Sequence, residues 1–161
     1  MPTIYDADRS FTLAEQPTAE ALISLACEIL ASRHQVGEAL TGPAHTKQLL
    51  QLRIGNSDRE LFHVMLLDCK HRLLHEETLF AGTINSATVH PREIARAALR
   101  WNAAACVISH CHPSGDVEPS RADIAITAEI KAALALLDVR LLDHIIVSRT
   151  GSLSLAERGL L

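Results

Sequence analysis

The feature that most constrains this chain is the stretch of residues 106–123, CVISHCHPSGDVEPSRAD. It begins as an apolar run typical of a buried strand and ends in a Ser-x-x-Asp sequence typical of a helix start. Side chains alternate between the faces of a strand, so His110 and His112 point to one side and Cys111 to the other. The sequence therefore predicts a strand, a tight loop and a helix that present two imidazoles and the carboxylate of Asp123 to one point.

Two imidazoles and one carboxylate are a ligand set for zinc. Catalytic zinc sites take three such protein ligands and leave a fourth position for water. Each residue also has a simpler explanation, because Ser120 would cap the helix without a metal and Asp123 is favoured in a first helical turn by the helix dipole. Their conjunction at this spacing favours a metal site with His110, His112 and Asp123 as ligands.

Composition limits the class of protein. A chain of 161 residues is long enough for one domain with a proper core, and 48% hydrophobic residues argue against disorder. Aromatic residues make up only 3%, so the core must consist of Leu, Ile, Val and Ala. The net charge of -4 lacks the basic footprint of tight, sequence-independent nucleic-acid binding.

Localisation signals point to the cytoplasm. The N-terminus shows no basic region followed by an apolar one, and no apolar run is long enough to cross a membrane. The four cysteines, at positions 27, 69, 106 and 111, form no C-x-x-C pair and suggest no disulfide framework. We therefore expect a cytoplasmic protein with no membrane segment.

Hydrophobic periodicity predicts the order of the elements. Residues 1–16 are polar and are expected to form a loose arm. The expected helices cover residues 18–33, 46–53, 91–102 and 120–137, with Gly55 as a C-cap. The expected strands cover residues 60–68, 73–80, 81–89, 104–110 and 140–148, followed by one last short strand. This order predicts an α/β fold, a three-layer mixed sheet flanked by helices, with an N-terminal arm and short helices over 1–47 and the main domain over 48–161.

Several separate motifs resemble known families. The pattern H-x-H-P, six residues, Ser, two residues, Asp resembles the JAMM motif of the MPN metalloprotease domain. The wider run HCHPSGDVEPSRADIAIT, with VHPREI before it and LLDHIIV after it, is similar to the RadC family of bacterial proteins. The resemblance covers residues 48–161. It implies zinc as the cofactor and a three-layer fold akin to that of cytidine deaminases.

The resemblance also implies roles for single residues. The metal ligands fall on His110, His112 and Asp123, and the general-base glutamate falls on Glu60. The family's serine falls on Ser120, whose hydroxyl could donate to the oxyanion of a tetrahedral intermediate. Read without the resemblance, Glu60 is a solvated charge at the end of a strand. If the sheet register differs, the rival carboxylates are Glu76, Glu77, Glu93 and Glu118.

The chain departs from the family pattern in two places. Cys111 stands where RadC proteins usually have Asn and other JAMM proteins have Ser or Thr. A thiol at this position could become an unplanned ligand or an oxidation site. The roughly 47 leading residues are also too few for the whole helix-hairpin-helix region of full-length RadC proteins, which weakens the case for nucleic-acid binding.

Three further groups have alternative interpretations. His71 and His75 are four residues apart, but Arg72 stands where the zincin motif needs its general base. His144 is either a partner that orients a metal ligand or a hydrogen-bonded core histidine. Three arginines share one helical face that could grip phosphates or an acidic partner, or could simply face solvent. They are Arg92, Arg96 and Arg100.

These observations predict a zinc-dependent hydrolase of the JAMM type that cleaves a peptide or isopeptide bond in a protein or peptide. The alternative is a DNA-associated accessory protein in repair or recombination, with a structural or vestigial metal site. A zinc deaminase is disfavoured because its H-x-E and P-C-x-x-C elements are absent. The oligomeric state is left open.

Overall fold

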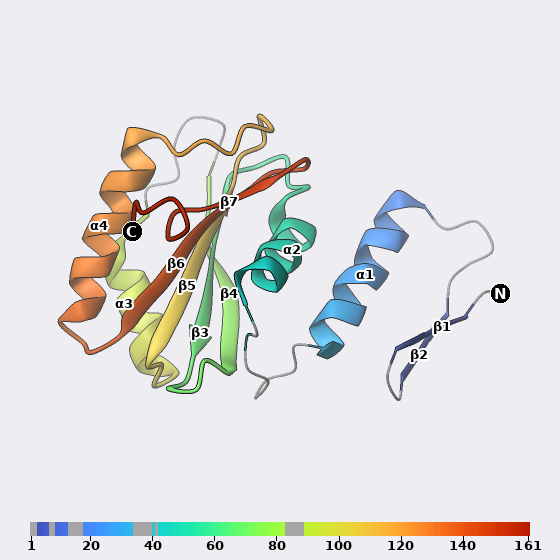
Figure 1. Cartoon of the computed structure of the whole chain (residues 1–161), viewed down its shortest axis with the longest axis horizontal. Coiled ribbons are helices and arrows are strands. Elements are labelled where there is room, and N and C mark those ends of the chain that lie inside the picture. Colours follow the sequence, from blue (N-terminus) through green and yellow to red (C-terminus); the bar gives the residue numbers. More distant parts are fainter. Residues whose placement is uncertain (1–2, 7–8, 13–17, 34–39, 41, 83–88) are drawn as a thin grey trace.

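The computed structural model describes residues 3–6, 9–12, 18–33, 40, 42–82 and 89–161 (Figure 1). Within these ranges the helices are α1 (Ala19–Arg33), α2 (Pro43–Ile54), α3 (Pro91–Arg100) and α4 (Arg121–Ala135). The strands are β1 (Thr3–Asp6), β2 (Arg9–Thr12), β3 (Leu61–Leu67), β4 (Leu73–Ala81), β5 (Ala105–Cys111), β6 (Arg140–Val147) and β7 (Ser152–Ser154). None of the helices in the described part of the chain combines the length and apolarity that crossing a membrane requires.

The five strands of the main sheet follow the order β4-β3-β5-β6-β7. Strand β3 is antiparallel to both β4 and β5, β5 is parallel to β6, and β6 is antiparallel to β7. A parallel pair needs a crossover connection, which α4 supplies between β5 and β6. The predicted mixed sheet is confirmed.

Helices cover both faces of this sheet, as predicted (Figure 1). Helices α3 and α4 pack on one face over a core that includes Val64 and Ile108. Helix α2 packs on the other face over a core that includes Met65 and Val107. The whole of β5 is buried, which explains the apolar run of its first four residues.

Helix α2 begins three residues before the predicted start. Pro43 occupies the first turn and Gly42 the N-cap position, where the missing N–H and fixed φ of proline suit a helix start. Gly55 follows the helix as predicted, but with φ -66° it does not need a left-handed backbone. A Cβ at Gly55 would clash with the carbonyl oxygen of Gln51 and lie 2.8 Å from that of Ser148, so glycine permits a close backbone approach.

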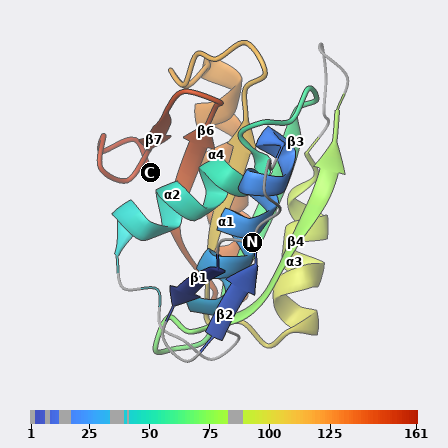
Figure 2. The ribbon, with the colours of Figure 1, turned by 90° about the vertical axis from the view of Figure 1, so that its right-hand side faces the viewer.

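The prediction of a loose arm over residues 1–16 is wrong for its described residues. Strands β1 and β2 pair antiparallel, with Ile4 opposite Phe11 and Tyr5 opposite Ser10. Aromatic and β-branched residues suit such a pairing and outweigh the polar composition of the segment. Figure 2 shows this hairpin and α1 in front of α2, on the side away from the sheet.

Other boundaries differ by a few residues. Helices α3 and α4 end two residues before the predicted positions, close to Asn102 and Asp138, which adopt positive φ angles of 50° and 56°. Short polar side chains tolerate this left-handed conformation and so end a helix. Of the extended piece predicted over residues 81–89, Ala81 belongs to β4 and residues 83–88 lie outside the described ranges. The domain boundary at residue 47 stays a prediction.

Candidate metal centre

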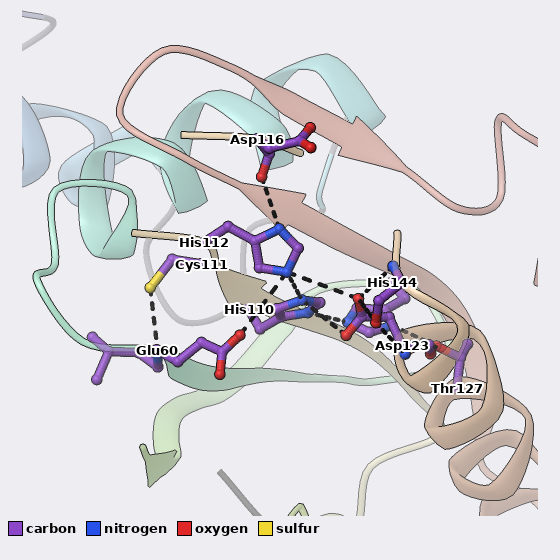
Figure 3. Close-up of polar contacts among 10 residues, drawn as sticks. Glu60, His110, Cys111, His112, Asp116, Asp123, Thr127 and His144 are labelled. Carbon is purple, nitrogen blue, oxygen red and sulfur yellow. Dashed lines mark hydrogen bonds and ion pairs between the residues drawn. The ribbon is translucent and has the colours of Figure 1, made fainter. Parts of the chain in front are cut away.

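Three elements meet at one edge of the sheet to form the candidate site (Figure 3). Because β3 and β5 are antiparallel, the start of β3 lies beside the end of β5, and Phe62 is opposite His110. Glu60, directly before β3, is thereby brought next to the histidines. The first turn of α4 supplies Asp123. These residues line a pocket of about 460 Å³ that also contains Ser120.

The predicted site residues surround one point. The Nε2 atoms of His110 and His112 are 2.9 Å apart. Asp123 Oδ1 lies 3.2 Å from His110 Nε2, and Asp123 Oδ2 lies 3.8 Å from His112 Nε2. Glu60 Oε1 lies 4.0 Å from His112 Nε2. The structure therefore brings together all four side chains to which metal or proton-transfer roles were assigned.

The protonation of His110 follows from a chain of hydrogen bonds in the core. The Thr127 hydroxyl donates to the backbone carbonyl of Asp123, one helical turn earlier. Its oxygen must then accept from His144 Nδ1, 2.6 Å away, which leaves His144 Nε2 without a proton. His144 Nε2 in turn accepts from His110 Nδ1 at 2.8 Å. His110 consequently directs an unprotonated Nε2 toward the pocket.

His144 can act in this chain only as a neutral imidazole. It is fully buried, and desolvation by burial lowers its pKa to about 3. Histidine ligands of metals usually donate their second ring N–H to a protein acceptor, which fixes ring orientation and tautomer. His144 occupies that place for His110.

His112 is oriented by a backbone acceptor instead. Its Nδ1 lies 2.7 Å from the carbonyl oxygen of Asp116, so Nδ1 donates and Nε2 turns inward. Two Nε2 lone pairs that face each other repel unless a proton or cation lies between them. Tetrahedral zinc would hold its two imidazole nitrogens about 3.3 Å apart, so only a small opening from 2.9 Å is needed. The donor set therefore fits a metal ion.

Asp123 is held in a capping box with Ser120. The Ser120 backbone N–H and hydroxyl both donate to Asp123 Oδ2, at 2.8 and 2.6 Å, and the Ser120 hydroxyl oxygen accepts from the Asp123 N–H. Burial by itself would raise the pKa of Asp123, and the hydrogen bonds that its carboxylate accepts from Ser120 lower it. Asp123 is an ionised carboxylate with a fixed orientation.

The third protein ligand has two candidates in this geometry. Glu60, His110 and His112 each offer a ligand atom, and the three atoms lie within 4.8 Å of one another. Asp123 Oδ1 is closer to the histidines than Glu60 Oε1 is. A metal ion could thus be bound by the histidines with either carboxylate.

The rival carboxylates are engaged elsewhere. Glu76 pairs with Arg53, Glu77 lies 3.7 Å from His75, Glu93 pairs with Arg96, and Glu118 pairs with Arg158. His71 and His75 are also apart from the centre. His71 Nε2 lies 3.0 Å from a nitrogen of Arg140, and the ring of His75 stacks on Trp101 with 4.0 Å between centroids.

Sequence reasoning missed Thr127 and the carbonyl of Asp116. Thr127 follows Asp123 by four residues, which places both on one face of α4 and was a usable signal. The Asp116 carbonyl belongs to the loop between β5 and α4, and backbone acceptors of that kind have no signature in side-chain identity.

The chain is similar to known proteins over most of its length. A family profile described as RadC-like JAB domain matches residues 40–160. A UPF0758 protein of Methylibium petroleiphilum is 49% identical over 148 residues, covering 92% of this chain and 67% of the relative. A UPF0758 protein of Vibrio cholerae is 48% identical over 138 residues, covering 86% of this chain and 87% of the relative.

A third relative, from Stenotrophomonas maltophilia, is 50% identical over 149 residues, covering 92% of this chain and 64% of the relative. The chain thus spans about two thirds of the length of several of these proteins. The resemblance seen in the sequence motifs is confirmed over most of the chain. The chain belongs to the RadC-like JAB domain family.

Proposed function

We propose that this protein is a zinc-dependent hydrolase that cleaves a peptide or isopeptide bond. One observation carries the proposal: two histidines, both with Nε2 turned inward, share a pocket with two carboxylates. A hydrolase of this kind needs ligands for a cation and a separate base for water, and both are within reach here. Membership of the RadC-like JAB domain family is compatible with such an activity.

Asp123 is the better third ligand and Glu60 the better base. Asp123 is fixed by Ser120 and its side chain is 16% exposed, whereas the Glu60 side chain is 34% exposed and makes the longest contact in the group. When bound by His110, His112 and Asp123, zinc would supply a water molecule with a pKa of about 7. Glu60 would take the proton of that water and pass it to the leaving amine.

Ser120 has a second possible task. In this structure its hydroxyl donates to Asp123, so it orients the proposed ligand. Donation to the oxyanion of a tetrahedral intermediate would require the hydroxyl to turn toward the pocket, which Ser120 lines. The oxyanion role of Ser120 therefore stays a prediction.

The pocket walls support a peptide-like substrate with an apolar side chain near the bond that is cleaved. Beside the polar centre, the lining is apolar and comes from β3, α4 and the segment before α3. These residues are Leu61, Phe62, Val89, Ala122 and Ile126. Pockets of this kind bind apolar groups through their walls and orient them through a few polar groups.

The DNA-associated alternative gains no support from the arginine face of α3. Arg92 and Arg96 both form ion pairs with Glu93, which reduces the positive charge available to phosphates.

We also propose a cytoplasmic location, supported by free thiols at Cys69, Cys106 and Cys111.

The proposal is tested by metal analysis together with a screen against peptide and isopeptide substrates. We expect about one zinc per chain, loss of zinc in His112→Ala, and retained zinc without turnover in Glu60→Gln. The control is Glu118→Gln, which changes an exposed carboxylate in the loop between β5 and α4 and should retain zinc and turnover. Loss of zinc in Glu60→Gln would instead make Glu60 the ligand, and unchanged turnover would end its role as base.

A further inference from the structure

The Cys111 side chain holds the backbone on both sides of Glu60. It leaves β5 on the face opposite to His110 and reaches the segment before β3 (Figure 3). Its Sγ–H donates to the carbonyl oxygen of Arg59, with Sγ and O 3.2 Å apart. Its Sγ accepts from the backbone N–H of Leu61, with N and Sγ 3.3 Å apart. Arg59 and Leu61 are the two neighbours of Glu60 in the chain.

These two hydrogen bonds continue the pairing of β3 with β5 beyond its last backbone rung. The described register between the strands ends with Phe62 opposite His110. One residue further, the thiol takes over the connection and reaches across to both flanks of Glu60. Because a carbonyl oxygen can only accept, the sulfur must carry its proton, so Cys111 acts as a thiol that both donates and accepts.

The position of the Glu60 carboxylate depends on this backbone. The Glu60 side chain is 34% exposed, and among the described residues its one ion pair is the 4.0 Å contact with His112. The same stretch of main chain has other anchors, because the Glu60 carbonyl accepts from the N–H of Gly82 at 2.8 Å and the Arg59 carbonyl accepts from the Ser57 hydroxyl at 2.8 Å. Cys111, in contrast, is fully buried beneath α2 and is tied to the same strand end as the histidines.

We propose that Cys111 is a positioning residue for Glu60. The Cys111 thiol sets the distance between the Glu60 carboxylate and the two histidines. The inference rests on the base role proposed for Glu60. Cys111 does not touch the metal position or the substrate, since it points to the opposite face of β5. Its removal lets residues 59–61 shift relative to β5, and a misplacement of about 1 Å at a reacting group can cost about 100-fold in rate.

The test compares Cys111→Val, which keeps an apolar side chain but loses both hydrogen bonds, with Cys111→Ser, which keeps a donor and acceptor. The matched control is Cys106→Val, since Cys106 is also fully buried in β5 but packs in the core on the opposite face. If Cys111→Val does not fold, Cys111→Ala removes the thiol without added bulk. The whole chain of 161 residues loaded with Co²⁺ is used alongside the zinc form.

Two readouts separate positioning from simple destabilisation. In the zinc form, Cys111→Val should lose at least about tenfold in kcat with bound zinc unchanged, and Cys111→Ser should recover part of it. In the cobalt form, the pH dependence of the visible spectrum should shift in the same direction as in Glu60→Gln. In the Glu60→Gln background, where no turnover is expected, Cys111→Val should add no further change to the pH dependence of the cobalt spectrum, because it acts through Glu60.

The outcomes distinguish this inference from the proposed function. If Glu60→Gln changes both readouts but Cys111→Val changes neither, the positioning role is overturned and the proposed function stands. An equal effect of Cys111→Val with and without Glu60 would also overturn it. If Glu60→Gln itself changes neither readout, the base role fails and this inference fails with it.

Discussion

If the proposed zinc site is correct, replacing Thr127 by valine should weaken zinc binding even though Thr127 lies outside the proposed set of ligands. Thr127 is 1% exposed, and its hydroxyl both accepts from His144 and donates to the Asp123 carbonyl. Valine has a similar shape but neither function. His144 would then keep an unsatisfied buried N–H at Nδ1, or move its proton to Nε2, where it would oppose the proton on His110 Nδ1.

The size of the effect follows from these two possibilities. Removing the partner of a metal-bound histidine typically costs about 10- to 100-fold in affinity, which is about 1.4–2.7 kcal/mol. The unsatisfied buried group should also lower the free energy of unfolding of the metal-free protein by about 1–3 kcal/mol. Thr127→Ser retains the hydroxyl and should lose much less on both measures.

Zinc affinity is measured by competition with a chromophoric chelator, and stability by urea unfolding of the metal-free protein. The reasoning is refuted if Thr127→Val binds zinc as tightly as Thr127→Ser and the wild type. If stability falls but affinity does not, the hydrogen-bond chain from Thr127 to His110 supports the fold without controlling the ligand.

Two further predictions concern stability. Gly55→Ala should lower the free energy of unfolding by about 1–3 kcal/mol, because its Cβ would meet two backbone carbonyl oxygens within 2.8 Å. The control is Gly42→Ala, whose Cβ would meet nothing within 4 Å and which should change little in the same urea titration. Burial by itself would raise the pKa of Glu76, but His63 and Arg53 outweigh it and hold that pKa below its usual 4.5. The stability that Glu76 contributes is therefore full above pH 4.5 and is lost as the pH falls through the lower pKa of the folded state. The difference in free energy of unfolding between the wild type and Glu76→Gln should shrink on acidification. A difference that is constant from pH 7 to pH 3 would contradict this.

Local spacing explains what could be predicted at the site. His110 and His112 share a side because a strand has a period of two, and Ser120 caps the helix of Asp123 because their hydrogen bonds span only three residues. The buried runs of β3, β5 and β6 are recognisable because both faces of a central strand must be apolar. Such features depend on neighbours within a few residues, and the family motifs added the roles.

Pairings between distant segments explain what could not be predicted from spacing. That Glu60 and not another carboxylate lies beside the histidines follows from the antiparallel register of β3 and β5. The hydrogen bond between His110 and His144 requires β5 and β6 to pair in parallel, with Ile108 opposite His144. Cys111 was identified as a departure from the family pattern, but its partners, Arg59 and Leu61, became apparent only in the fold.

The sequence by itself determined the α/β class, the two histidines on one strand face and the carboxylate in the following helix turn, since these follow from backbone periodicity and capping. Only the tertiary structure decided which carboxylates lie beside the histidines and which tautomers and supporting hydrogen bonds complete the centre. Those depend on strand register and on the packing of α4 over β5 and β6. Contacts between residues 34 or 50 positions apart are set by the whole core.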